Sequence, residues 1–304
     1  MIINPSTSHL RLFFTLRGSI LLQVLPQISG VMAWSAGVVA LHQWAPDWCP
    51  SFNGTALSLI GIALSVFMGS RNSICYERWW EGRRQFGALV SHARQFGREV
   101  CLIDDADGSA RKRMIDLTIA YTQALIPHLR PGANAQKALA RLSPADREVC
   151  AGSRNPPDAL LRMIVREPDA LRRAGRLGEI SFQTLDRTIG DISLTQAACE
   201  RLRSTPIPLV YRLLLYRTSY LFLMLLPFGY VESHAWAAPV VAGLIAYAFF
   251  GLDELAGQLE RPFDTHPNGL PIEALADTIE INLRETLGET DLPALPAPKN
   301  HLLM

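Results

Sequence analysis

Side chains at spacings that support catalysis or metal binding are scarce in this sequence of 304 residues. The motifs HExxH, GxSxG and GxxxxGK[ST] are absent, and no GxGxxG loop opens a helix after a strand. The acidic run Asp104–Gly108 suggests a calcium loop, but the frame that uses its glycine puts Ile103 at the first ligand position. We therefore interpret this run as a solvated turn between helices, and we expect no enzyme activity, cofactor or metal site.

The cysteines and the net charge exclude further classes of protein. A disulfide framework or a thiolate metal site needs paired cysteines, whereas the five present here stand 26 to 49 residues apart without a CxxC pair. A formal net charge of +1 excludes a strongly basic nucleic-acid-binding protein. We expect no nucleic-acid partner.

One stripe of residues could instead line a passage for ions. Ile62, Val66 and Ser70 recur at i, i+4 and i+8, which places them on one face of a helix. Small residues surround them, and small residues let transmembrane helices approach closely. The spacing fits a tightly packed helix of a bundle, and it also fits a pore helix repeated around a symmetry axis. Periodicity alone favours the packed helix.

The elements that carry this stripe are apolar enough to cross a membrane. The chain is 49% hydrophobic and only 19% charged, with a mean hydropathy of +0.13. Charged residues are absent from residues 19–45, 55–70 and 235–252, and a fourth run, 207–231, is interrupted only by Arg212 and Arg217 near its start. A bilayer core of about 30 Å needs about 20 apolar residues. We predict four transmembrane helices; a secretory signal peptide fits the long first run poorly.

The basic residues predict how these helices are oriented. Arginines precede the first run, follow the second, precede the third and follow the fourth, while the connections 42–54 and 232–234 contain no Lys or Arg. The positive-inside rule then places both termini in the cytoplasm. Proline is absent between residues 55 and 102, so the second transmembrane helix is predicted to continue far beyond the membrane.

These patterns predict an all-α membrane protein with six segments. Residues 1–23 form a cytoplasmic N-terminal segment, and residues 24–70 contain the first two transmembrane helices. Residues 71–204 form a helical cytosolic domain, residues 205–252 hold the third and fourth transmembrane helices, and residues 253–290 form a cytosolic helical segment. Residues 291–304 are a Pro-rich tail.

The segment GIALSVFMGSRNSICYERWWEGRRQFGALV, residues 61–90, resembles the long second helix of bacterial bestrophins. Its RNS at residues 71–73 and its Y-x-R-W at residues 76–79 carry the match. Similar segments occur at Arg17–Ser19, in CERLRSTPIPLVY, in LLPF and in ELAGQLERPF. The resemblance extends from about residue 4 to residue 287.

The resemblance implies a homopentameric ion channel of the bacterial inner membrane that conducts small monovalent ions. Each subunit would contribute four transmembrane helices and a helical cytosolic domain. The pore neck falls on Ile62, Val66 and Ser70, and a cytosolic aperture falls on Ile180. The expected partners are further copies of the chain, the lipid bilayer and monovalent ions. The alternative is a membrane-anchored helical scaffold or signalling protein that passes no ions.

Three features depart from the family or stay open. Ser70 stands where the family usually has a bulky aromatic residue, which predicts a wider and wetter neck; the aliphatic neck leans toward cations. Only one carboxylate, Asp264, follows Pro262–Phe263 within six residues, so we expect no calcium activation. Arg71 either forms a packing pair or contributes a ring of charge at the pore mouth.

Overall fold

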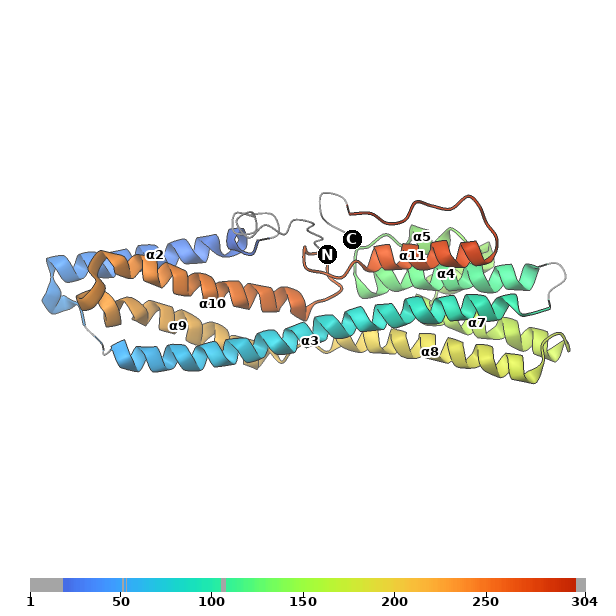
Figure 1. Ribbon diagram of the computed structural model, residues 1–304, viewed down its shortest axis with the longest axis horizontal. Coiled ribbons are helices and arrows are strands. Elements are labelled where there is room, and N and C mark those ends of the chain that lie inside the picture. The colour runs from blue at the N-terminus through green and yellow to red at the C-terminus, as the bar shows by residue number, and fades with distance from the viewer. Residues whose placement is uncertain (1–18, 51, 53, 105–107, 299–304) are drawn as a thin grey trace. The chain divides into compact units, whose positions relative to one another are not determined.

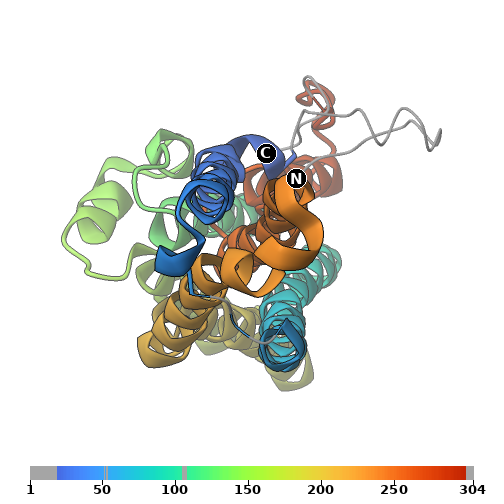
Figure 2. The same ribbon diagram turned by 90° about the vertical axis from the view of Figure 1, so that its left-hand side faces the viewer.

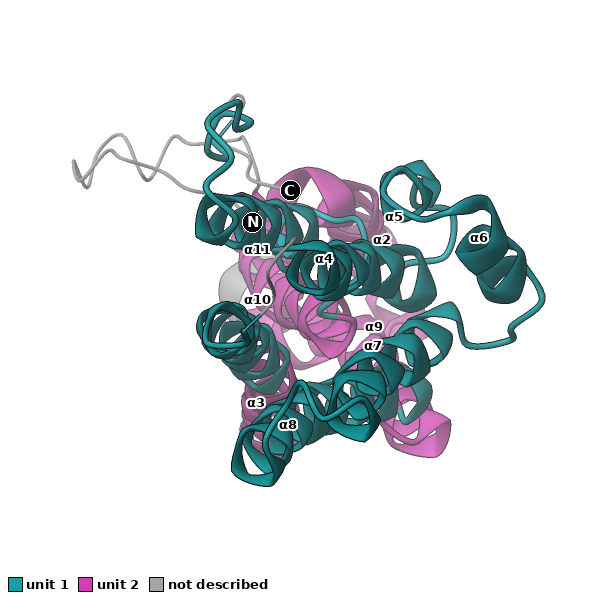
Figure 3. Ribbon diagram, turned by 90° about the vertical axis from the view of Figure 1, so that its right-hand side faces the viewer, with its two compact units in different colours: residues 1–4, 80–205, 262–304 teal, residues 5–79, 206–261 magenta. Residues whose placement is uncertain are grey.

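The computed structural model describes residues 19–50, 52, 54–104 and 108–298, and the regular elements within these ranges are all helices. The chain forms two compact units, coloured separately in Figure 3. The spanning unit comprises the described residues up to Trp79 together with Pro206–Arg261, and the polar unit comprises Trp80–Thr205 and the described residues from Pro262 onward. Most of the predicted segment 1–23 and of the turn at Asp104–Gly108 lies outside the described residues.

The spanning unit contains the long apolar helices. They are α2 (Leu21–Trp44), the first part of α3 (Gly54–Cys101), α9 (Leu209–His234) and α10 (Ala238–Glu260). All four are long and apolar enough to cross a membrane. The predicted continuous helix over residues 55–102 is confirmed by α3, which continues into the polar unit as one helix (Figure 1).

The core of the spanning unit joins all four helices. α2, α9 and α10 lie side by side, as Figures 1 and 2 show. Leu64 of α3 belongs to the same buried apolar cluster as Val24 and Ile28 of α2, Phe222 of α9 and Phe250 of α10. Burying a large apolar side chain contributes about 1.5–3 kcal/mol in water, but in lipid the close fit of side chains replaces most of that term.

Two helix boundaries differ from the sequence-based prediction. The connection expected at residues 232–234 is helical, and the chain turns instead in a short 3-10 helix, η2 (Ala235–Ala237). The turn lies here because Pro239 stands in the first turn of α10, where its missing N–H removes no helical hydrogen bond. α9 begins at Leu209 because Pro206 and Pro208 disfavour helix before it.

The polar unit is a helical bundle around α4. It consists of the second part of α3, α4 (Ser109–Leu129), α5 (Gln136–Leu139), α6 (Pro144–Ala151), α7 (Pro156–Arg173), α8 (Glu179–Ser204) and α11 (Ile272–Thr286). α4 is almost completely buried from Met114 to Ile126 and contacts α5, α7, α8 and α11. Ser143 caps the N-terminus of α6, because its Oγ accepts a hydrogen bond from Asp146 N at 3.2 Å.

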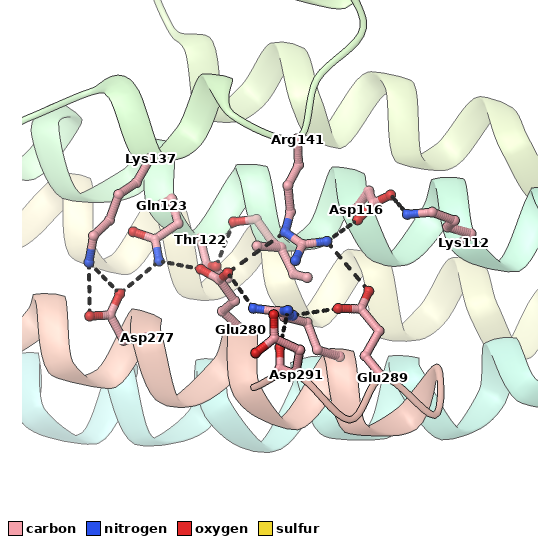
Figure 4. Close-up of polar contacts among 12 residues, drawn as sticks. Lys112, Asp116, Thr122, Gln123, Lys137, Arg141, Asp277, Glu280, Glu289 and Asp291 are labelled. Atoms are coloured by element: carbon pink, nitrogen blue, oxygen red, sulfur yellow. Dashed lines mark hydrogen bonds and ion pairs between the residues drawn. The ribbon is translucent and has the colours of Figure 1, made fainter. Parts of the chain in front are cut away.

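A network of ion pairs fastens α11 to the bundle (Figure 4). Arg141 lies 2.7 Å from Asp116 of α4, and 3.7 Å from both Glu280 of α11 and Glu289 beyond it. Arg284 contacts the same Glu289 at 2.6 Å. The C-terminal half of α11 is therefore held through charges, in addition to the buried apolar face of the helix.

Candidate ion-conduction site

The stripe predicted to form the neck faces away from its own chain. Ile62 and Val66 are each 63% exposed, and Ser70 is exposed. The buried residues of the same stretch are Leu57, Leu64, Met68, Arg71 and Cys75. At about 100° per residue, the centre of the stripe lies opposite the centre of this buried face. The helix therefore packs with one face and leaves the predicted neck face uncovered.

Ser70 presents a hydroxyl that is already engaged on one side. Its Oγ donates to the carbonyl of Val66 at 3.0 Å, one turn earlier on the same helix. The donor is thus satisfied within α3, and the lone pairs of Oγ stay free for water. This arrangement places a polar acceptor, rather than a ring, at the end of the stripe.

Ile180, the predicted aperture residue, lies in the polar unit as the second residue of α8. Its side chain is 83% exposed, while Leu177 before it and Leu185 after it are buried. The first backbone bond of the helix runs from Phe182 N to Gly178 O at 3.0 Å. Ile180 is therefore presented outward from the first turn of a helix whose neighbouring apolar residues face the core.

Arg71 is buried in the spanning unit and is paired with acidic side chains of its own chain. Its side chain is only 1% exposed and makes an ion pair with Asp253 of α10. A second carboxylate, that of Glu260, lies 4.0 Å away. Burial costs a charged group several kcal/mol unless it is paired, so these partners explain its position. The sequence alone did not identify these two partners. Both follow the fourth apolar run directly, in the segment DELAGQLE at residues 253–260.

Glu260 connects this pair to the ends of two other segments. Its Oε1 accepts a hydrogen bond from the backbone N–H of Ile207 at 3.2 Å, ahead of α9. Its backbone carbonyl accepts one from Nε of Arg78 at 3.4 Å. The ends of α9 and α10 are thereby held against α3 close to the predicted neck.

The loop that follows α10 is held by a guanidinium group. Nε of Arg130 donates to the carbonyl of Phe263 at 2.7 Å, and Nη2 donates to the carbonyl of Leu270 at 3.2 Å. Nη1 lies 3.0 Å from Glu273 of α11. The Arg130 side chain is 6% exposed. The buried guanidinium group of Arg130 therefore binds two backbone carbonyls of this loop.

The titratable groups of the polar unit serve its structure. Burial raises the pKa of the Cys199 thiol to about 12, so this cysteine stays protonated and unreactive. A hydrogen bond from Arg113 lowers the pKa of Asp146, against the opposing effect of burial. Among the described residues, no group of three or more His, Cys, Asp or Glu side chains gathers at a metal-binding distance.

Comparison with known proteins agrees over nearly the whole chain. A family model described as "Bacterial/Fungal Bestrophin protein" matches residues 1–285. The chain is 38% identical, over 98% of its length and 96% of the relative's, to a voltage-dependent anion channel-forming protein of Mesorhizobium japonicum. It is 34% identical to the voltage-dependent anion channel-forming protein YneE of Escherichia coli, over 99% of each chain.

A solved structure has the same fold. The crystal structure of a bacterial bestrophin homologue from Klebsiella pneumoniae superimposes with a TM-score of 0.83 at 32% identity. The match covers 88% of this chain and 99% of the other. Together with the family match over residues 1–285, this shows that the chain is a membrane protein of the bestrophin family.

Proposed function

We propose that this chain is the subunit of a homopentameric channel for small monovalent ions. The observation that carries the proposal is the stripe Ile62, Val66 and Ser70, which is exposed and lies opposite the packed face of α3. Five copies around one axis would bring these stripes together, and the stripes would line a narrow apolar neck. An apolar ring excludes water when it is narrow, so it can gate the pore by dewetting.

The ion type is the finer part of the proposal. The Mesorhizobium and Escherichia relatives are named as anion channel-forming proteins, which favours anions here. The aliphatic side chains of Ile62 and Val66 supply no positive ring edges that would attract anions. Charges outside the neck would then determine the preference, and a reversal potential measures it directly.

The same proposal places the channel in the bacterial inner membrane with both termini in the cytoplasm. Arginines flank the spans on one side only, and the connections on the other side contain neither Lys nor Arg. Reporter fusions after residue 304 and within residues 46–50 would test this orientation. Activity of a cytoplasm-specific reporter at the second position would contradict it.

We further propose that conduction needs no calcium. Arg130 already donates to two carbonyls of the loop after Phe263, and the following stretch supplies the single carboxylate Asp264. Calcium prefers six to eight oxygen ligands. Currents that a chelator abolishes and calcium restores would contradict this part of the proposal.

Ion flux through purified protein in liposomes tests the main proposal. A channel produces flux and a reversal potential under a salt gradient, whereas a membrane-anchored scaffold, the alternative function, produces none. We expect Val66→Phe to alter flux, because it narrows the neck. The matched control is Phe67→Leu, since Phe67 is also exposed but lies about 100° around the helix. Wild-type protein without flux, or equal effects of both variants, would contradict the proposal.

A further inference from the structure

The first turn of α8 has no side-chain cap. Its N-cap residue is Gly178, which has no side chain to accept a hydrogen bond from the first N–H groups. The preceding turn passes through Gly175 with φ +71°. The first turn of α8, which carries Ile180, therefore frays unless other contacts hold it.

One side chain from the end of α7 supplies those contacts. Nη1 of Arg172 lies 3.6 Å from Oε2 of Glu179, the first residue of α8. The guanidinium carbon also lies 4.9 Å from the centre of the Phe182 ring, at cation–π distance. On α7 itself, Nη2 of Arg172 is anchored 2.9 Å from Asp169.

The contacted residues leave Ile180 free to point elsewhere. Glu179 and Phe182 are three residues apart and share one face of α8, whereas Ile180 lies about 130° around the helix from the centre of that face. Its side chain is 83% exposed. Arg172 therefore contacts the turn on a different face from the one that carries Ile180.

We propose that Arg172 is the positioning residue of the cytosolic aperture: by holding Glu179 and Phe182, it fixes the first turn of α8 and thereby the orientation of Ile180. This inference rests on the proposed function of Ile180 as a pore constriction. It predicts that the spatial precision of the aperture, and with it the discrimination between ions, depends on a residue that does not line the pore.

Hydrogen exchange tests the positioning role without any measurement of flux. In Arg172→Gln we expect the amides of residues 182–185, which donate the first backbone hydrogen bonds of α8, to exchange about three- to thirtyfold faster, the range that the loss of one cation–π contact and one exposed ion pair predicts. Phe182→Leu should act in the same direction. The matched control is Arg173→Gln, because Arg173 is 75% exposed and pairs with Asp169 but not with α8. Equal exchange in Arg172→Gln and Arg173→Gln would overturn the inference.

Flux and reversal potential then connect the turn to the pore. We expect Arg172→Gln alone to change the discrimination between ions. When it is added to Ile180→Ala, we expect little further change. If Arg172 acted through its charge, its effect would persist in Ile180→Ala and Arg173→Gln would reproduce it. If Ile180→Ala changes discrimination and neither Arg172→Gln nor Phe182→Leu does, this inference fails alone. If wild-type protein passes no ions, the proposed function fails instead.

Discussion

Removing the buried cation of the spanning unit should destabilise the protein strongly. Arg71→Met keeps a long flexible side chain at a position that is 1% exposed, but it leaves the carboxylate of Asp253 without its ion-pair partner. Glu260 also loses the positive charge 4.0 Å away, although it retains the backbone N–H of Ile207 as a hydrogen-bond donor. The predicted cost therefore comes chiefly from Asp253.

The magnitude follows from how deeply each group is buried. Removing one partner of a fully buried ion pair costs about 3–5 kcal/mol. Asp253 is 28% exposed, so water recovers part of its solvation, and we expect about 2–4 kcal/mol. At about 2–4 °C per kcal/mol for a chain of this order of size, the melting temperature should fall by about 5–15 °C.

Thermal unfolding in detergent measures this change. A thiol-reactive dye is a suitable reporter once the exposed Cys101 is replaced by serine, because Cys75 is completely buried one turn after Arg71 and reacts only when the unit opens. The double variant Arg71→Met with Asp253→Asn should recover most of the loss, since the unpaired carboxylate is then absent. Arg84→Met is the control, because Arg84 is 63% exposed and its pair with Glu81 is worth about 0.3–0.5 kcal/mol. If the Arg71→Met and Arg84→Met proteins have the same melting temperature, the reasoning is refuted.

Three further outcomes are expected. Ser70→Phe should lower single-channel conductance by adding a ring to the end of the neck; an unchanged or higher conductance would contradict the wider neck. The pKa of Asp146 is held below its ordinary value of about 3.9 by Arg113, so its stabilising effect is present above that pH and is lost as pH falls through the lowered pKa. Melting curves of Asp146→Asn should therefore depend less on pH below about 4 than those of wild-type protein. In native protein at neutral pH, maleimide should modify the exposed Cys101 and spare the buried Cys199, and rapid labelling of Cys199 would contradict its burial.

The helices were predictable because their signals are local. Continuous apolar runs and the absence of proline from residues 55–102 were sufficient to predict α3. The turn between the last two long helices was placed three residues too early, since Glu232 and Ser233 look like a polar connection. The structure continues α9 through Glu232 and Ser233, because neither residue prevents a helix. The position of the turn depends instead on Pro239, which stands in the first turn of α10.

The contacts of charged residues were not predictable in the same way. The partner of Arg71 lies 182 residues later in the chain, and nothing in the spacing of either residue connects them. Ile180 was predicted as an aperture residue only from the resemblance, because a single isoleucine has no periodicity of its own. Arg172 was missed for a related reason: its contacts with α8 depend on the turn through Gly175, whose geometry the sequence does not specify.

The small residues of α3 show why periodicity alone favoured packing over a pore. A Cβ added to Gly61 would lie 3.0 Å from Cζ of Phe222, so this glycine permits close approach of α9. Among the described residues, and apart from its chain neighbours and the adjoining backbone of α3 itself, no atom lies within 4 Å of a Cβ added to Gly69, which stands beside the stripe. The two glycines look alike in sequence, but one serves packing within the chain and the other adjoins a face that its own chain leaves open. A packing role and a pore role are therefore compatible on one helix, because they use opposite faces of it.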